Sequence, residues 1–254
     1  MKTLYAVLAA AALALGGATA NAADAAKPPV SVVLVHGAFA DGSSWNEVIP
    51  LLTAQGLNVI AVQNPLTSLA DDVAFTKRAI ANQPGKVVLV GHSWGGTVIT
   101  QAGNDDKVGA LVYVAAFAPS AGQSVEDTTK GRATPPGLAS PVVDAAGFVS
   151  LSKETVAKHF AQDLSPKQTA LIYATQGAIR GANFAEKVDA AAWQGRPSWY
   201  IVAEQDHMID PALQNEFAAK IKATRVALPS SHVPMVSHPK VVAKAIIDAA
   251  NGLK

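Results

Sequence analysis

The sequence contains no cysteine, and this absence excludes several kinds of chemistry. Disulfide bonds, thiol catalysis, thiolate metal sites and lipid attachment to a cysteine cannot occur in this chain. Charged residues are also scarce, at 15% of the chain, and Lys plus Arg total 20 against 19 for Asp plus Glu. Because there is no excess of positive charge to neutralise phosphates, nucleic acid is not expected as a partner.

The chain also lacks an apolar run long enough to cross a membrane. The longest one, residues 4–15, follows Met1-Lys2 and falls short of the roughly 20 residues that a spanning helix needs. It is followed by Ala20-Asn21-Ala22, the small-x-small pattern that signal peptidase cleaves. We therefore expect residues 1–22 to be a signal peptide. The mature chain, residues 23–254, would be exported to the periplasm or the medium, with no membrane insertion after cleavage.

Six short runs rich in β-branched residues alternate with helical patterns. Each run is bounded by turn residues and is apolar on both faces, which is typical of a fully buried strand in a parallel sheet. The runs are residues 30–35, 58–62, 86–90, 108–114, 198–202 and 224–228. The helical patterns include one that opens at a capping box, Ser44-Trp45-Asn46-Glu47, and closes at Gly56, and others over residues 94–101, 211–221 and 239–252. This alternation predicts a single α/β domain with a doubly wound, mainly parallel sheet of about six strands.

The alternation of strands and helices is interrupted once, between about residues 117 and 196. This insertion begins with loop residues and then carries two helical patterns, over 152–164 and from a capping box at Ser165-Pro166-Lys167-Gln168. We expect a small helical cap over the carboxyl edge of the sheet, where such folds bind their ligands. The aromatic side chains of the cap would line a pocket or form the cap's own core; they are Phe148, Phe160, Tyr173, Phe184 and Trp193.

The segment Gly91-His92-Ser93-Trp94-Gly95 fits the pattern G-x-S-x-G. A predicted strand runs directly into it and a predicted helix leaves it, which is the context of a nucleophile on a sharp strand-to-helix turn. A phosphate-binding turn is the alternative, but the segment has neither G-x-G-x-x-G nor a Lys-Ser/Thr pair. The pattern therefore predicts that Ser93 is a catalytic nucleophile.

A catalytic serine needs a histidine as its base, and in folds of this kind the chain order is serine, acid, histidine. His232 lies in the loop just beyond the last predicted strand, in Pro229-Ser230-Ser231-His232-Val233-Pro234. It is the expected base, and His238, next to the last predicted helix, is the alternative.

The acid is expected just after the predicted strand at residues 198–202, where three carboxylates stand close together. Asp206 lies just past the strand end, whereas Glu204 is close enough to belong to the strand itself. Asp210 precedes Pro211 and fits the cap of the next helix. Asp206 is therefore the expected acid, with Glu204 and Asp210 as alternatives.

The oxyanion of an acyl-transfer reaction needs two backbone N–H donors. One should be Trp94, the residue after the nucleophile, and the other should come from the turn after the first strand. In that turn Gly37 permits unusual torsions, and Ala38 is the expected donor with Phe39 as second choice. The side chains of Phe39 and Trp94 would line the pocket or pack in the core.

Metal and cofactor are not expected. The six histidines are scattered, with no His-Glu-x-x-His and no paired spacing, and acyl transfer on a serine requires no cofactor.

Three motifs in this sequence resemble one branch of the α/β-hydrolase superfamily, the branch that holds plant methylesterases, hydroxynitrile lyases and bacterial esterases. They are Val33-Leu34-Val35-His36-Gly37-Ala38, Gly91-His92-Ser93-Trp94-Gly95-Gly96 and the segment from Ser231 to Pro239. The resemblance runs from about residue 30 to the end of the chain. It implies a small helical cap, no pair of leading antiparallel strands, and a triad at Ser93, Asp206 and His232.

The same resemblance bears on the reaction. The lyases of this branch place a lysine directly after the triad histidine and a threonine at the position of Gly37. This sequence has Val233 and Gly37, which favours hydrolysis.

The expected function is that of a serine esterase that hydrolyses small, uncharged, apolar carboxylic esters through an acyl-enzyme. A small-molecule ester is the expected partner, and the oligomeric state stays open. Two alternatives remain: a receptor of the same fold that binds small molecules with negligible turnover, and a hydroxynitrile-lyase-like C–C lyase.

Overall fold

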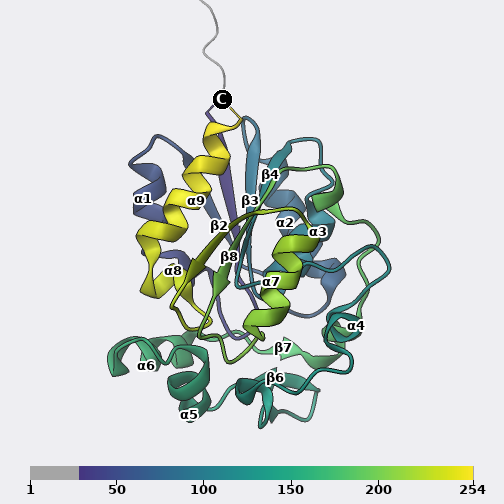
Figure 1. Ribbon diagram of the computed structural model, residues 1–254, viewed down its shortest axis with the longest axis vertical. Coiled ribbons are helices and arrows are strands. Elements are labelled where there is room, and N and C mark those ends of the chain that lie inside the picture. The colour runs from purple at the N-terminus through teal and green to yellow at the C-terminus, as the bar shows by residue number, and fades with distance from the viewer. Residues whose placement is uncertain (1–28, 254) are drawn as a thin grey trace, which may run out of the picture.

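A six-stranded parallel sheet forms the centre of the molecule (Figure 1). The computed structural model describes residues 29–253, so the expected signal peptide at residues 1–22 lies outside the described residues. The strand order is β2-β1-β3-β4-β8-β9, which confirms the predicted parallel α/β sheet. The strands are β1 (Ser31–Val35), β2 (Asn58–Val62), β3 (Val87–His92), β4 (Val108–Val114), β8 (Ser198–Ala203) and β9 (Thr224–Leu228).

The strands differ in burial according to their place in the sheet. Every residue of β1 and β3 is buried, because these central strands have neighbours on both sides and helices over both faces. The expectation of full burial is wrong for β2 and β9, the two edge strands. Ile60 of β2 is 43% exposed, and Thr224 and Arg225 of β9 also reach solvent. An edge strand has a neighbour on one side alone and is less covered by helices.

Helices cover both faces of this sheet. Figure 1 shows α1 and α9 on one side, where they contact each other, and α2 and α3 on the other, also in mutual contact. The helices outside the cap are α1 (Ile49–Thr53), α2 (Leu69–Ala81), α3 (Trp94–Ala102), α7 (Pro211–Lys220), α8 (Pro234–Ser237) and α9 (Pro239–Asn251). Within residues 29–253, none of the helices has the length and hydrophobicity to cross a bilayer.

The first helical stretch differs from the expected one. The structure has a 3-10 turn, η1 (Gly42–Trp45), capped by the side chain of Asp41, and then the separate short helix α1. Ser44 is therefore not the cap residue, and its hydroxyl donates to the carbonyl of Asp41. Pro50 lies in the first turn of α1, where its missing N–H is tolerated, whereas it would break a helix that continued through it.

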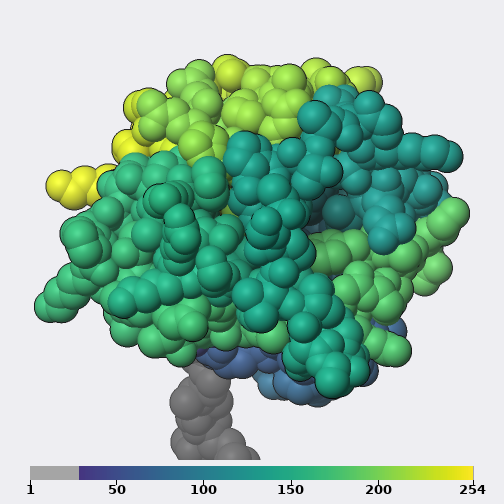
Figure 2. Space-filling view, turned by 90° about the horizontal axis from the view of Figure 1, so that it is seen from below, coloured from purple at the N-terminus to yellow at the C-terminus, as the bar shows by residue number. Residues whose placement is uncertain are grey.

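The cap, residues 117–196, lies at the end of the molecule opposite the C terminus (Figure 1), and its teal and green segments cover most of the face in Figure 2. It contains a three-stranded antiparallel sheet, β5-β6-β7, in addition to the expected helices. Its elements are α4 (Val125–Thr129), η2 (Pro136–Leu138), β5 (Val142–Val143), β6 (Phe148–Ser150), α5 (Lys153–Thr155), η3 (Val156–Phe160), α6 (Pro166–Thr175), β7 (Ile179–Arg180), η4 (Gly181–Ala185) and η5 (Ala192–Gln194).

The two helical patterns predicted in the cap have different outcomes. The capping box at Ser165 and Gln168 forms with both of its hydrogen bonds and begins α6. The pattern over residues 152–164 forms α5 and then the π-helix η3, but helical structure ends at Phe160. Ala161 ends it because its φ of −142° lies outside the helical region.

Candidate active site

Ser93 occupies a strained turn between β3 and α3. Its φ is +52° and its ψ is −120°, a conformation that L-residues rarely adopt. The tightness of the turn depends on glycines, because a Cβ at Gly91 would lie 2.5 Å from the Gly95 carbonyl oxygen and one at Gly95 would lie 2.6 Å from that of Val35. The hydroxyl of Ser93 is thereby presented at the carboxyl edge of the sheet, at the amino end of α3.

The loops after β8 and β9 bring Asp206 and His232 together. His232 Nδ1 lies 2.6 Å from Asp206 Oδ2, and the side chains are 1% and 0% exposed. The other carboxylate oxygen accepts the backbone N–H groups of Met208 at 2.7 Å and Ile209 at 3.0 Å. Gln214 Nε2 donates to Oδ2 at 2.7 Å. These bonds satisfy the buried carboxylate, which in turn fixes the proton on Nδ1 of His232 and leaves Nε2 as an acceptor.

The alternative acids and base stand elsewhere. Glu204 is exposed, and Asp210 caps α7 by accepting the N–H of Ala212 at 2.9 Å, as predicted. His238 adjoins α9 and lies 2.9 Å from the hydroxyl of Ser237. None of the three is bonded to His232 in the described structure.

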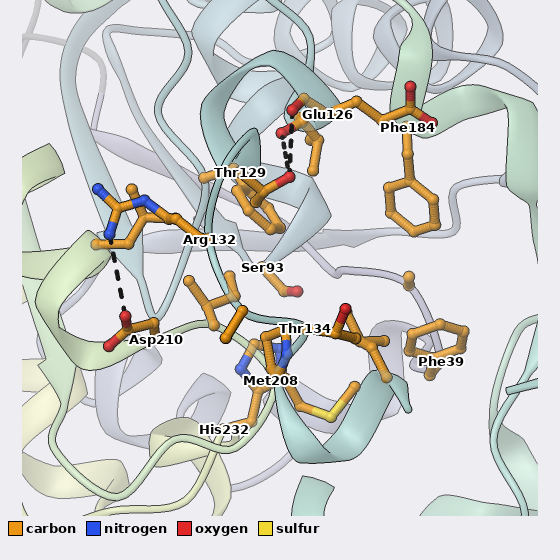
Figure 3. Close-up of a pocket in the computed structure, with 18 residues that line it drawn as sticks. Phe39, Ser93, Glu126, Thr129, Arg132, Thr134, Phe184, Met208, Asp210 and His232 are labelled. Atoms are coloured by element: carbon orange, nitrogen blue, oxygen red, sulfur yellow. Dashed lines mark hydrogen bonds and ion pairs between the residues drawn. The ribbon is translucent and has the colours of Figure 1, made fainter. Parts of the chain in front are cut away.

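Ser93 and His232 line one cavity of about 310 Å³ between the sheet and the cap (Figure 3). No hydrogen bond joins these two side chains in the described structure; such bonds commonly tighten when substrate is bound. The other lining residues are Ala38, Phe39, Phe117, Val125, Glu126, Thr129, Arg132, Ala133, Thr134, Pro135, Leu138, Phe184, Met208, Ile209, Asp210 and Leu213.

The cavity has two chemically different sides. Figure 3 shows Phe39 and Phe184 on one side of Ser93, and Arg132 and Asp210 on the opposite side. Arg132 is paired with Glu216 and lies 4.0 Å from Asp210, so the guanidinium at the cavity wall is neutralised. Most of the remaining wall is apolar. The arrangement therefore offers space for an uncharged ligand on both sides of the serine.

The two backbone groups expected to bind an oxyanion differ from their neighbour Phe39 in their hydrogen bonding. Within residues 29–253, neither the N–H of Ala38 nor that of Trp94 donates to another residue. The N–H of Phe39, the second choice, already donates to the carbonyl of Gly177 at 3.1 Å. The N–H of Ala38, a residue that lines the cavity, and the N–H of Trp94, the residue next to Ser93, are thus not engaged within the described chain, whereas the N–H of Phe39 is.

Gly37 is required here for a reason other than the one expected. Its backbone does not have a positive φ, so torsional freedom does not explain it. Instead, a Cβ at this position would lie 2.6 Å from Ser93 Cβ and 2.8 Å from the His92 carbonyl oxygen. Glycine therefore allows the turn after β1 to approach the nucleophile closely.

The indole of Trp94 does not line the cavity, which corrects one of the two pocket expectations; Phe39 does line it. The Trp94 ring is fully buried, and its Nε1 donates to Asp72 Oδ2 at 2.7 Å. The other oxygen of Asp72 accepts the N–H of Leu66 at 2.8 Å. Burial raises the pKa of Asp72 to about 6, although these two hydrogen bonds by themselves lower it. The indole N–H needs a partner when it is buried, and Asp72 provides it away from the cavity.

His92, like Asp72, has a role at the site that its position in the sequence did not indicate. It is fully buried, its Nε2 donates to the backbone carbonyl of His232 at 2.8 Å, and the two rings are 4.7 Å apart. Burial holds the pKa of His92 well below its ordinary value, so the ring is neutral. It therefore ties the end of β3 to the loop that carries His232.

The part of the chain that the structure describes has no group of three His, Asp or Glu side chains arranged to hold a metal ion.

The sequence matches the model of the "Alpha/beta hydrolase family" over residues 32–245, and the chain belongs to this family of enzymes. It is 29% identical to a pyrethroid hydrolase from Sphingobium wenxiniae, with 87% of each chain covered. It is 27% identical to methylesterase 2 from Arabidopsis thaliana, with 86% of this chain and 95% of that one covered. The crystal structure of a pyrethroid hydrolase from Sphingobium faniae superposes with a TM-score of 0.75 at 24% identity, covering 87% of this chain and 98% of that one.

Proposed function

We propose that this protein is a serine esterase that hydrolyses small, uncharged, apolar carboxylic esters. The observation that carries the proposal is the pair of His232 and Asp206, 2.6 Å apart, beside a serine on a strained strand-to-helix turn that faces the same cavity. Membership of the α/β-hydrolase family supports hydrolysis, and the names of the related hydrolases and methylesterases support an ester as the substrate.

In the proposed mechanism, His232 Nε2 removes the proton of Ser93 as the serine oxygen attacks the ester carbonyl. The N–H groups of Ala38 and Trp94 bind the oxyanion of the tetrahedral intermediate. His232 then gives its proton to the departing alcohol, which leaves an acyl group on Ser93. Water, deprotonated by the same histidine, hydrolyses this acyl-enzyme. Asp206 holds the imidazole in the required tautomer and stabilises the imidazolium that forms in each step.

The proposed substrate class follows from the cavity wall. Phe39 and Phe184 provide apolar surface on one side of Ser93, and a volume of about 310 Å³ suits a small ligand. Arg132 is already paired with Glu216 and Asp210, so a carboxylate on the substrate would have to compete with two acidic groups. An uncharged ester meets no such competition.

The lyase alternative is weakened by the space at Gly37. A threonine at this position, as in the lyases, would bring a Cβ to 2.6 Å from Ser93 Cβ in this backbone. Val233 also stands where the lyases have lysine.

A panel of p-nitrophenyl esters tests the proposed function and separates it from the receptor alternative. We expect turnover of neutral acyl esters, and slower hydrolysis, by about tenfold or more, of a half-ester of matched length that carries a carboxylate. Tight binding of the neutral esters without turnover would instead support the receptor.

We propose in addition that residues 1–22 are removed on export to the periplasm or medium. Intact-mass measurement of the exported protein should show a chain that begins at or close to Ala23. A mass that retains residues 1–22 would contradict this.

A further inference from the structure

A short segment of the cap, residues 159–163, is hydrogen-bonded to the loop that carries Asp206. Gln162 Nε2 donates to the backbone carbonyl of Gln205 at 2.6 Å. His159 Nδ1 lies 3.2 Å from His207 Nδ1, so one of these two rings donates to the other. Gln205 and His207 are the immediate neighbours of Asp206 on either side. The cap segment therefore holds the acid's loop at both flanking residues.

The same cap segment also contacts the loop that carries His232. Asp163 Oδ2 accepts the N–H of Ser231, the residue before His232, at 3.0 Å. The ring of Phe160 is fully buried and lies edge-on to the His232 ring, with centroids 5.2 Å apart. The contact on the backbone and the contact on the imidazole thus come from the same short segment of the cap, through Asp163 and Phe160.

Neither catalytic loop has regular secondary structure to fix it. Residues 204–210 join β8 to α7, and residues 229–233 join β9 to α8, without a helix or strand of their own. Their position depends on individual hydrogen bonds. On the sheet side, His92 binds the carbonyl of His232. On the cap side, the corresponding contacts come from residues 159–163 and from Gly137, whose N–H donates to the carbonyl of His207 at 2.9 Å.

We propose that Gln162 and Asp163 are positioning residues that hold Asp206 and His232 in reactive geometry. This inference rests on the proposed esterase function. Gln162 and Asp163 act through the backbone of the two loops and do not line the cavity, so their loss should affect the rate of reaction and leave substrate binding largely unchanged. The cap would then contribute to catalysis as well as enclosing the substrate.

The test compares Asp163→Ala and Gln162→Ala with wild type in hydrolysis of a neutral p-nitrophenyl ester and in labelling of Ser93 by a fluorophosphonate. Each variant loses one hydrogen bond to a loop, so we expect kcat and the labelling rate constant to fall about fivefold, with KM within about twofold. Asp163→Asn keeps an oxygen acceptor for the N–H of Ser231. It should restore both rates to within about twofold of wild type.

Glu154→Ala is the matched control, because Glu154 lies in the same part of the cap and its 72% exposed side chain is paired with Lys158. It should behave as wild type. If Asp163→Ala and Gln162→Ala had the same labelling rate constant and the same kcat as wild type, the positioning role would be overturned. The positioning role would also be overturned if Asp163→Asn were as slow as Asp163→Ala and had an equally lowered melting temperature. That result would indicate a structural role for Asp163. A wild type that is neither labelled nor active would overturn the proposed function itself.

Discussion

Replacing Gly37 with alanine should disturb the nucleophile without unfolding the protein. The added Cβ would lie 2.6 Å from Ser93 Cβ, whereas carbon atoms pack at about 3.5–4.0 Å. It would also lie 2.8 Å from the His92 carbonyl oxygen. Either the turn after β1 or the Ser93 turn must therefore move by about 1 Å. A displacement of this size at reacting groups costs about 10²-fold in rate.

The same overlap should cost about 1–3 kcal/mol of folding free energy, as overpacking does elsewhere. For a chain of this size that corresponds to a melting temperature lowered by about 2–12 °C. We therefore expect Gly37→Ala to be folded but about 100-fold slower in kcat/KM with a neutral ester.

Kinetics with p-nitrophenyl esters and thermal unfolding followed by circular dichroism provide both readouts. Gly195→Ala is the control, because a Cβ at Gly195 meets nothing within 4 Å. A Gly37→Ala enzyme with wild-type kcat/KM would refute the argument that close approach at this residue sets the geometry of the nucleophile.

Two further predictions concern buried carboxylates. Asp206→Asn should fold but lose on the order of 10⁴-fold in kcat, because His232 would take the wrong tautomer. Glu204→Gln, at an exposed site, should have a kcat near that of wild type. The reverse result would show that the acid is misassigned. The pKa of Asp72 in the folded protein, about 6, lies above its ordinary value of 3.8. The native state therefore binds the proton more tightly than the unfolded state does. As a result, the free energy of unfolding falls as pH rises between these two values. Relative to Asp72→Asn, the free energy of unfolding of wild type should fall by about 3 kcal/mol between about pH 4 and 7 and stay level above it, as measured by urea unfolding. A difference between the two proteins that does not change with pH would contradict this.

The parts of the fold that the sequence predicts well are those with a strong local pattern. The buried strands of four or more β-branched and aliphatic residues, such as β1 and β3, have unambiguous composition, and the helix that begins at Pro211 follows its cap residue. Because Ser93, Asp206 and His232 each lie in the short segment that follows a predicted strand, parallel topology alone places them at one edge of the sheet.

The features that were missed depend on contacts between distant segments. Strands β5 and β7 have two residues each, too short for periodicity to identify them. Asp72 is one of two adjacent acidic residues in the first turn of α2, and its burial against Trp94 follows from the packing of α2 on α3. The role of Gly37 likewise depends on its distance from Ser93, which no local signal encodes.

Hydrolysis of a neutral p-nitrophenyl ester by Ser93→Ala, beside wild type, tests the central claim most directly. Alanine fits the turn at least as well as serine, so the variant should fold as wild type does and bind the ester with similar affinity. Its kcat should fall by about 10⁶-fold, the usual cost of removing the nucleophile of such a triad. A Ser93→Ala protein that kept a substantial part of the wild-type turnover would contradict the assignment of Ser93 as the nucleophile.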